Sequence, residues 1–270
     1  MRSRVAKLGV LVAAVAVAAA GVGVAAVANA DTTAVHYVAL GDSFASGQGA
    51  GTDIQDPDNC KRSLDGYPAR WAAKHEPTSF QNNACAGATA KAVTEKQLSL
   101  LTAETTLVTV QAGGNDLDFF GTLLACFFGS DDECKKAIAA KEALISTTLA
   151  SDVDALLAAI KDRAPNAEVV LVGYPLLFET SRDCVAGSFT KNEAGYFNAA
   201  VDKLDDELAE RAAAAGYGFA DPRTAFAGHG ACGSEQWIND DLNKINDIVH
   251  PNADGYRLGY LPTIEASIGR

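Results

Sequence analysis

The chain has 270 residues, with 34 acidic and 22 basic side chains, so its formal charge at pH 7 is −12. This acidic balance argues against nucleic acids and anionic membranes as electrostatic partners. About half of the residues are hydrophobic (48%), and the length suits one sizeable domain with a proper core.

The first thirty residues have the pattern of a secretory signal peptide. A basic start (residues 2–7) precedes an uncharged run over residues 8–27, and Ala28-Asn29-Ala30 offers a small-x-small cleavage site. A retained membrane anchor is the alternative, because the apolar run is nearly long enough to span a bilayer. We expect cleavage after residue 30. Loss of the three basic residues there would change the charge from −12 to −15 and leave residues 31–270 as one secreted domain, with no further membrane span.

All six cysteines lie beyond residue 30. An even number of cysteines in an exported chain indicates disulfides, and six cysteines allow fifteen pairings. The spacing favours neighbours along the chain, namely Cys60 with Cys85, Cys126 with Cys134, and Cys184 with Cys232. A metal site is the alternative, but no CxxC or CxH pattern occurs, so we expect none.

Strands and helices alternate along the remainder of the chain. Strands are expected near residues 35–40, 79–82, 105–113, 167–175 and 216–222, and helices near 68–75, 90–101, 133–164, from a capping box at 190–193 onward, and 253–268. The third and fourth strands are continuously apolar, which fits burial on both faces of a parallel sheet. This alternation predicts a parallel sheet with helices on both faces, which binds ligands at the carboxyl ends of its strands.

Four short segments follow strands or lie near the C-terminus. They are Gly41-Asp42-Ser43, Cys85-Ala86-Gly87, Gly113-Gly114-Asn115-Asp116 and Asp247-Ile248-Val249-His250. A hydrolytic serine needs a base, a group that orients the base, and donors aimed at the developing oxyanion. Ser43 at the end of a strand can present both its Oγ and its own N–H, although an ordinary turn is the alternative. Neither a Gly-Lys-Ser/Thr phosphate loop nor a Gly-x-Ser-x-Gly elbow occurs.

The other three segments can supply the remaining parts of such a site. Gly87 can bring its N–H close to a substrate, and the Asn115 carboxamide can act as a second donor; a turn and a helix N-cap are their alternatives. Asp247 precedes His250 by three residues, so its carboxylate can reach Nδ1 and leave Nε2 for the serine. Surface or structural roles are expected for the remaining histidines, His36, His75 and His229.

In combination, these residues resemble the SGNH, or GDSL-type, serine hydrolases. The four letters of the family name map in chain order onto Ser43, Gly87, Asn115 and His250, within the blocks GDSFASG, AGATA, GGND and DIVHP. The three neighbouring cysteine pairs are also similar to those of the family's secreted bacterial lipases and esterases. The resemblance implies an α/β/α flavodoxin-like fold with a five-stranded parallel sheet, and hydrolysis of esters without a metal or an organic cofactor.

The resemblance also implies a role for each residue. Ser43 would be the nucleophile and His250 the base, with the N–H groups of Ser43 and Gly87 and the Asn115 amide as oxyanion donors. Asp247 matches the carboxylate that usually orients the histidine, although some secreted relatives use a backbone carbonyl instead. The implied protein is a monomeric secreted lipase or esterase that acts on small-molecule or lipid esters. An acyltransferase, a phospholipase or a carbohydrate acetylesterase would use the same residues, and a binding module without activity is the remaining alternative.

The segment from Leu117 to Gly129 is apolar on every side. A helix without a polar face is either fully buried or has a second apolar partner. We expect buried core here, with an acyl-chain groove beside the site as the alternative.

Overall fold

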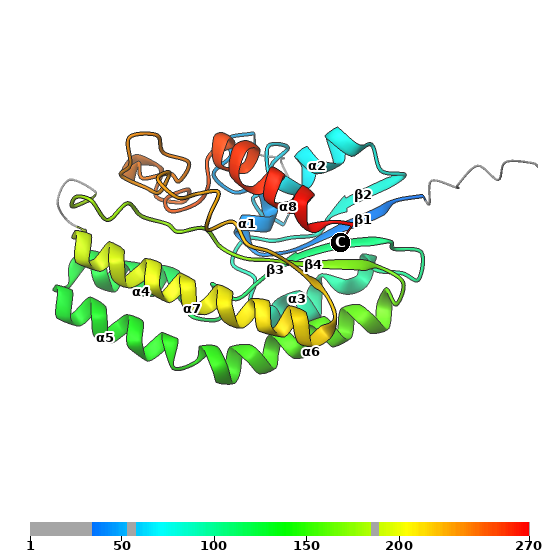
Figure 1. Ribbon diagram of the computed structural model, residues 1–270, viewed down its shortest axis with the longest axis horizontal. Helices are drawn as coiled ribbons and strands as arrows, with labels where there is room; N and C mark the ends of the chain where they lie inside the picture. Colours follow the sequence, from blue (N-terminus) through cyan, green and yellow to red (C-terminus); the bar gives the residue numbers. More distant parts are fainter. Residues whose placement is uncertain (1–33, 53–57, 185–188, 270) are drawn as a thin grey trace, which may run out of the picture. The chain divides into compact units, whose positions relative to one another are not determined.

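Five parallel strands form one sheet in the order β2-β1-β3-β4-β5 (Figure 1). They are β1 (His36–Gly41), β2 (Ser79–Asn82), β3 (Leu107–Gln111), β4 (Glu168–Val172) and β5 (Gly218–Ala220). The computed structural model describes residues 34–52, 58–184 and 189–269, so the expected signal peptide over residues 1–30 lies outside the described residues. In β1, β3 and β4 nearly every side chain is buried, as continuous apolar runs in a covered sheet predict.

Helices cover both faces of the sheet and complete three layers (Figure 1). On one face α2 (Tyr67–His75) packs beside α8 (Leu261–Ser267), and α8 also contacts β4 and β5. On the other face α3 (Ala90–Lys96) contacts β1, α7 (Lys191–Ala215) contacts β4 and β5, and α6 (Ala150–Arg163) packs against both helices. The predicted α/β/α fold with a five-stranded parallel sheet is confirmed.

The remaining elements are short or interrupted. They are α1 (Ser43–Ser46), α4 (Phe119–Phe128), α5 (Asp131–Glu142), the 3-10 helices η1 (Leu98–Leu100) and η4 (Leu242–Lys244), and the π-helical turns η2 (Ile145–Leu149) and η5 (Gly255–Tyr260). The run from Asp131 to Arg163 is long and apolar enough to cross a membrane by length and composition alone. Its α5 packs on α4 and α7, with Cys134 and Ile138 buried between them.

The end of β1 approaches β3 unusually closely. Gly41 has a φ of +135°, and a Cβ at this position would overlap the backbone carbonyl of Gln111, so only glycine fits. The buried side chain of Gln97 binds both the N–H and the carbonyl of Gly41, each at 2.8 Å. The strand order also reverses between β1 and β3, which is where sheets of this topology open a crevice for ligands.

Candidate active site

The side chains of Ser43 and His250 meet at the carboxyl edge of the sheet. Nε2 of His250 lies 2.7 Å from Oγ of Ser43, although 207 positions separate them in the sequence. Both line a cavity of about 230 Å³. A base is therefore in hydrogen-bond contact with a hydroxyl that opens onto a space for a ligand.

Ser43 is the first residue of α1, directly after β1. Asp42 caps this helix, because its Oδ1 accepts the N–H of Phe44 at 2.9 Å. Gly47 ends the helix with a φ of +91°, and its N–H donates to the carbonyl of Ser43 at 3.2 Å. The N–H of a first helical residue has no acceptor within the helix. Ser43 thus offers an N–H and a hydroxyl from the same residue.

The ring of His250 is held in one orientation. Its Nδ1 lies 3.0 Å from the carbonyl oxygen of Ile248, and the ring of Phe44 packs on it at 5.1 Å between centroids. Burial lowers the pKa of His250 to about 4, so the imidazole is neutral at pH 7. A carbonyl only accepts hydrogen bonds, so Nδ1 carries the proton and the lone pair of Nε2 faces Ser43.

Asp247 does not take the place expected from its spacing. The carbonyl of Ile248 is the hydrogen-bond acceptor of Nδ1, and Asp247 contributes its own carbonyl, which accepts the backbone N–H of His250 at 3.1 Å. One acceptor satisfies the single N–H of a neutral imidazole. The acceptor of Nδ1 in this structure is thus a backbone carbonyl, which is the alternative to the Asp247 carboxylate.

The backbone around His250 is strained and tightly held. Val249 has a φ of +58°, a conformation that β-branched residues rarely adopt. Asn239 holds it in place: its carbonyl accepts the N–H of Val249 at 2.8 Å, and its own N–H donates to the carbonyl of His250 at 2.9 Å. A Cβ at Gly49 would lie 3.0 Å from Cβ of His250, so the segment after Ser43 fits closely against the base.

Gly87 and Asn115 line the same cavity as Ser43 and His250. Gly87 is exposed with a φ of +80°, and its N–H makes no hydrogen bond to any part of the chain that the structure describes. Asn115 donates one amide hydrogen to the carbonyl of Ala88 at 3.0 Å, which leaves the second hydrogen available. The structure thus brings together every residue that the motifs single out, except the carboxylate of Asp247.

One contact near the site could not be anticipated from the motifs. The hydroxyl of Tyr174, which follows β4, donates to Oδ2 of Asp42 at 2.6 Å and accepts the N–H of Gly114 at 3.2 Å. It therefore links the helix cap beside Ser43 to the glycine before Asn115. Burial raises the pKa of Asp42 to about 7. The only sequence signal is the position of Tyr174 in Gly173-Tyr174-Pro175, at the carboxyl end of a predicted strand.

The walls of the cavity are largely apolar. Besides Phe44, which packs on His250, seven apolar residues line it: Phe119, Phe120, Leu177, Val201, Leu204, Ile245 and Val249. The first two belong to α4, for which buried core was expected. That expectation is wrong for one face of the helix, because Leu123 and Cys126 are buried whereas Phe120 and Phe128 are exposed.

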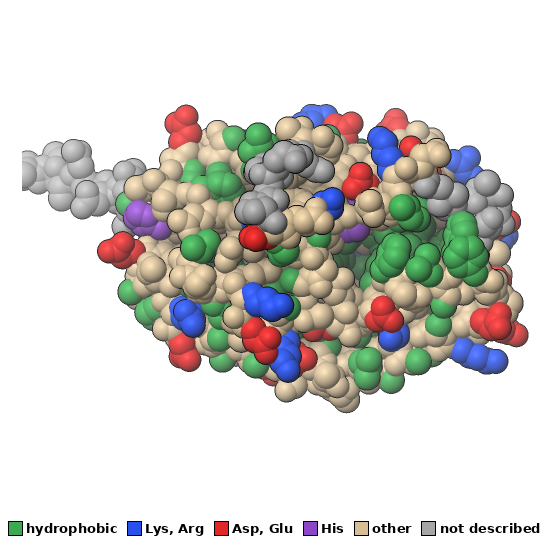
Figure 2. All heavy atoms as spheres, turned by 180° about the vertical axis from the view of Figure 1, so that it is seen from behind, with side chains coloured by type: hydrophobic (Ala, Val, Ile, Leu, Met, Phe, Trp, Pro, Cys, Tyr) green, Lys and Arg blue, Asp and Glu red, His purple; other side chains and the backbone are tan. Residues whose placement is uncertain are grey.

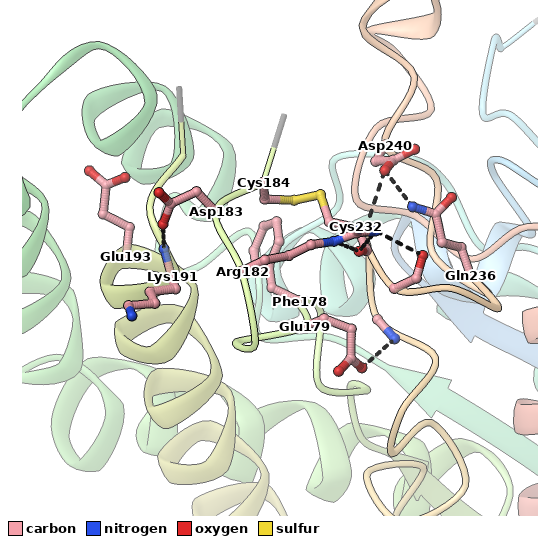
Figure 3. Close-up of a disulfide and its surroundings, with 12 residues drawn as sticks. Phe178, Glu179, Arg182, Asp183, Cys184, Lys191, Glu193, Cys232, Gln236 and Asp240 are labelled. Atoms are coloured by element: carbon pink, nitrogen blue, oxygen red, sulfur yellow. Dashed lines mark hydrogen bonds between the residues drawn. A yellow bond between two sulfur atoms is a disulfide. The ribbon is translucent and has the colours of Figure 1, made fainter. Parts of the chain in front are cut away.

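Three disulfides are present: Cys60–Cys85, Cys126–Cys134 and Cys184–Cys232. Figure 3 shows the third, which fastens the segment after β4 to the loop that leads to His250. Nε of Arg182 donates to the carbonyl of Cys232 at 2.8 Å, and Asp240 accepts the N–H of Cys232 at 3.2 Å. Within residues 34–52, 58–184 and 189–269, no group of three or more His, Cys, Asp or Glu side chains is placed to hold a metal ion.

Comparisons with known proteins agree with this geometry. The profile of the GDSL-like Lipase/Acylhydrolase family matches residues 39–258. Lipase 1 of Streptomyces coelicolor is 42% identical over 233 residues, which are 86% of each chain. Crystal structures of phospholipase A1 from Streptomyces albidoflavus and of the extracellular lipase from Streptomyces rimosus both superpose with a TM-score of 0.83. The first is 37% identical in sequence and the second 39%. Each alignment covers 87% of this chain, and it covers 99% of the phospholipase chain and 100% of the lipase chain. The chain therefore belongs to the GDSL-like lipase and acylhydrolase family and is an ester hydrolase of that type.

Proposed function

We propose that the protein is a secreted hydrolase that cleaves carboxylic esters of lipids through an acyl-enzyme on Ser43. The observation that carries this proposal is the 2.7 Å contact between Nε2 of His250 and Oγ of Ser43 at an apolar cavity. Secretion is supported by the three disulfides, which fit an oxidising compartment, and by the extracellular relative from Streptomyces rimosus. N-terminal sequencing of the enzyme from culture medium tests it, with Asp31 as the expected first residue.

The first step forms the acyl-enzyme. Oγ of Ser43 attacks the ester carbonyl while Nε2 of His250 takes its proton, and the proton on Nδ1 stays hydrogen-bonded to the carbonyl of Ile248. The N–H groups of Ser43 and Gly87 and the free amide hydrogen of Asn115 stabilise the oxyanion. His250 then gives its proton to the leaving alcohol, and the ester bond breaks.

The second step releases the acid. A water molecule enters the cavity beside His250. Nε2 of His250 removes a proton from this water as the water oxygen attacks the acyl carbonyl. The same three donors hold the second oxyanion, and Ser43 leaves with the proton from His250. Before each attack the carbonyl of Ile248 keeps the single proton of the neutral imidazole on Nδ1, so Nε2 is free to act as the base.

The substrate class follows from the walls of the cavity. Phe119, Phe120 and Leu177 give it an apolar lining that suits an acyl chain better than a sugar. A phospholipid is a second candidate, because the structural relative from Streptomyces albidoflavus is a phospholipase A1. We expect the enzyme to act as a monomer.

The direct test is a panel of p-nitrophenyl esters from acetate to palmitate, run on the wild type and on Ser43→Ala. We expect the Ser43→Ala variant to lose activity on every ester and to escape labelling by a fluorophosphonate probe. Activity of the wild type should persist beyond butyrate, since the apolar wall accepts a longer chain. A steep fall beyond butyrate overturns the proposed acyl site, and an active Ser43→Ala variant overturns the proposed nucleophile.

Asn115→Ala tests the oxyanion donors separately. Removal of one such donor costs about 10²–10³ in kcat, because its hydrogen bond strengthens in the transition state. Asn166→Ala, in the exposed turn before β4, is the matched control and should retain the wild-type kcat. Equal rates for the two variants would remove Asn115 from the mechanism.

A further inference from the structure

Exposed apolar side chains gather at one place on the surface. Eight large hydrophobic residues are exposed in the described part of the chain, and four of them line one apolar hollow: Phe120, Leu124, Phe128 and Ile245. We call these four residues the α4 patch. Figure 2 shows hydrophobic side chains gathered around a hollow on this face of the molecule. Contiguous exposed apolar surface of this kind marks a binding surface more often than scattered single residues do.

The geometry of α4 produces the patch. Phe120, Leu124 and Phe128 are four residues apart, so they lie along one face of the helix, while Leu123 and Cys126 face the core. Phe128 is the most exposed of the three, with 80% against 46% for Phe120 and 37% for Leu124. Phe128 therefore projects farthest from the protein.

The patch continues directly into the proposed catalytic cavity. Phe120 and Ile245 line both the apolar hollow and the cavity that holds Ser43, and Val249, next to His250, also lines both. If a lipid surface covered the patch, its lipid molecules would thus lie next to the opening of the cavity. A protein partner in the same place would close off that opening.

We propose that the α4 patch docks the enzyme on the surface of a neutral or zwitterionic lipid aggregate. The proposal rests on the proposed function, because it supplies the route by which an insoluble ester reaches Ser43. Phe128 inserts among the lipids, Leu124 and Phe120 lie at the boundary, and an acyl chain passes along Phe120 and Ile245 into the cavity. Phenylalanine and leucine side chains on one face of a helix bury into the boundary between headgroups and acyl chains in this way.

Charge selects the kind of lipid surface. Three carboxylates, those of Asp131, Asp132 and Glu133, stand in the first turn of α5, which begins three residues after Phe128. Hydrogen bonds from Asn192 and from the backbone of Ser130 hold the pKa values of Asp131 and Glu133 below their ordinary range, so both stay ionised.

Asp240 borders the hollow as well. The nearby basic residues along the chain, Lys135, Lys136 and Lys244, carry three positive charges against these four negative ones, and the chain expected after loss of residues 1–30 carries −15. An anionic surface is therefore repelled.

The test measures binding without turnover. Purified protein is sedimented with vesicles of ether-linked phosphatidylcholine, which has no ester to cleave, and the partition coefficient is determined. Phe128→Ser should lower the partition coefficient about tenfold or more, because the variant no longer buries a phenylalanine side chain among the lipids. The matched pair is Leu124→Ser and Leu100→Ser, because both leucines are 37% exposed and Leu100 lies in η1, outside the patch. Only Leu124→Ser should weaken binding.

A soluble ester separates docking from chemistry. All three variants should hydrolyse p-nitrophenyl acetate at the wild-type rate, since Leu124, Phe128 and Leu100 do not line the catalytic cavity. Ether-linked phosphatidylglycerol vesicles should bind less than phosphatidylcholine vesicles at low salt, and added salt should narrow the difference.

Each contrary result has a distinct meaning. The docking surface is overturned if Phe128→Ser partitions onto the vesicles as the wild type does. It is also overturned if the wild type binds phosphatidylglycerol vesicles more strongly than phosphatidylcholine vesicles. A concentration-dependent dimer that Phe128→Ser abolishes, without vesicle binding, assigns the patch to a second copy of the chain and also overturns it. Failure of the wild type to cleave p-nitrophenyl acetate would instead count against the proposed function, whatever the vesicles show.

Discussion

The imidazole of His250 has only uncharged hydrogen-bond partners, and this determines how it titrates. Nδ1 donates to the carbonyl of Ile248, and Nε2 faces the hydroxyl of Ser43. Neither partner carries a charge that would offset the loss of hydration on burial. The pKa of His250 therefore falls to about 4 from an ordinary value near 6.5.

The activity should consequently persist in mildly acidic solution. The neutral imidazole is the base, so activity is lost only as pH falls through the pKa of His250 in the folded enzyme. We expect the acid limb of kcat/KM for p-nitrophenyl butyrate to have an apparent pKa of about 4, well below 6.5. An acid limb near 7 would point instead to Asp42, whose pKa burial raises to that value.

Tyr174 acts on the site through other residues and is a positioning residue. Its hydroxyl is the donor to Asp42 and the acceptor for Gly114, so it couples the loop of Ser43 to the loop of Asn115. Tyr174 is itself held by Asp205, a buried carboxylate that accepts its backbone N–H at 2.9 Å. The rings of Phe44 and Tyr174 also pack in a T-shaped arrangement, at 5.2 Å between centroids.

Tyr174→Phe should impair both stability and turnover. A buried carboxylate oxygen and a backbone N–H would lose their partners, which costs about 1–3 kcal/mol in the free energy of unfolding. Because the two loops are then coupled less tightly, we expect kcat to fall about tenfold, equal to about 1.4 kcal/mol, with KM little changed. Tyr217→Phe, just before β5, is the control. A Tyr174→Phe enzyme with the wild-type kcat would exclude the positioning role.

Residues of the site differ in how well their sequence context reveals them. Ser43, Gly87, Asn115 and His250 stand in short motifs after strands, and the parallel sheet brings such positions to one edge. The Ile248 carbonyl has no such signature, because every residue carries a carbonyl and only the backbone path decides which one meets Nδ1. The contact of Tyr174 with Asp42 spans 132 positions and depends on packing that no local pattern encodes.

At the scale of elements, the loop before His250 needs fastening because it contains little regular structure. The only helical element described between β5 and His250 is the three-residue η4. Cys184–Cys232 ties this loop to the segment after β4, and Asn239 ties it to Gly49 through its side chain at 3.1 Å. These links keep the backbone of His250 next to α1.

Removal of this disulfide should destabilise the fold more than removal of the shorter one. Cys184–Cys232 spans 48 positions and Cys126–Cys134 spans 8, so loop entropy assigns them about 4 and about 2.5 kcal/mol. Cys184→Ser/Cys232→Ser and Cys126→Ser/Cys134→Ser form a matched pair for urea unfolding. We expect the first double variant to lose more free energy of unfolding and more activity. The reverse order would show that chain entropy does not govern these links.

The exposed face of α4, where buried core was expected, has no signature in the sequence. A helix apolar on every side has the same sequence pattern whether it is buried or whether one face borders a binding surface. Only the position of α4 beside the cavity, with Phe120 on its open side, distinguishes the two. The apolar character of the segment from Leu117 to Gly129 was evident from the sequence, whereas the exposed face of α4 was not.

At the scale of the whole molecule, the charge acts on stability as well as on lipid choice. A formal charge of −12 at pH 7, or −15 after the expected loss of residues 1–30, makes the folded chain repel itself. The clustered ion pairs around Arg223 oppose this repulsion, and its bonds to Asp221 and Asp206, at 2.7 and 2.9 Å, are the closest of them. Exposed pairs contribute only about 0–1 kcal/mol each, so the general repulsion outweighs them.

Salt should therefore stabilise the protein. The screening length falls from about 30 Å at 0.01 M to about 10 Å at 0.1 M, which weakens the repulsion between distant carboxylates. We expect Tm at pH 8 to rise by about 2–4 °C between 0.01 and 0.3 M NaCl, which corresponds to about 1 kcal/mol for a chain of this size. The same salt series at pH 5 is the control, because partial protonation of the carboxylates lowers the net charge there and should leave a smaller rise. An equal rise at both pH values would indicate a general effect of salt on apolar burial, and a fall at pH 8 would mean that the ion pairs outweigh the repulsion.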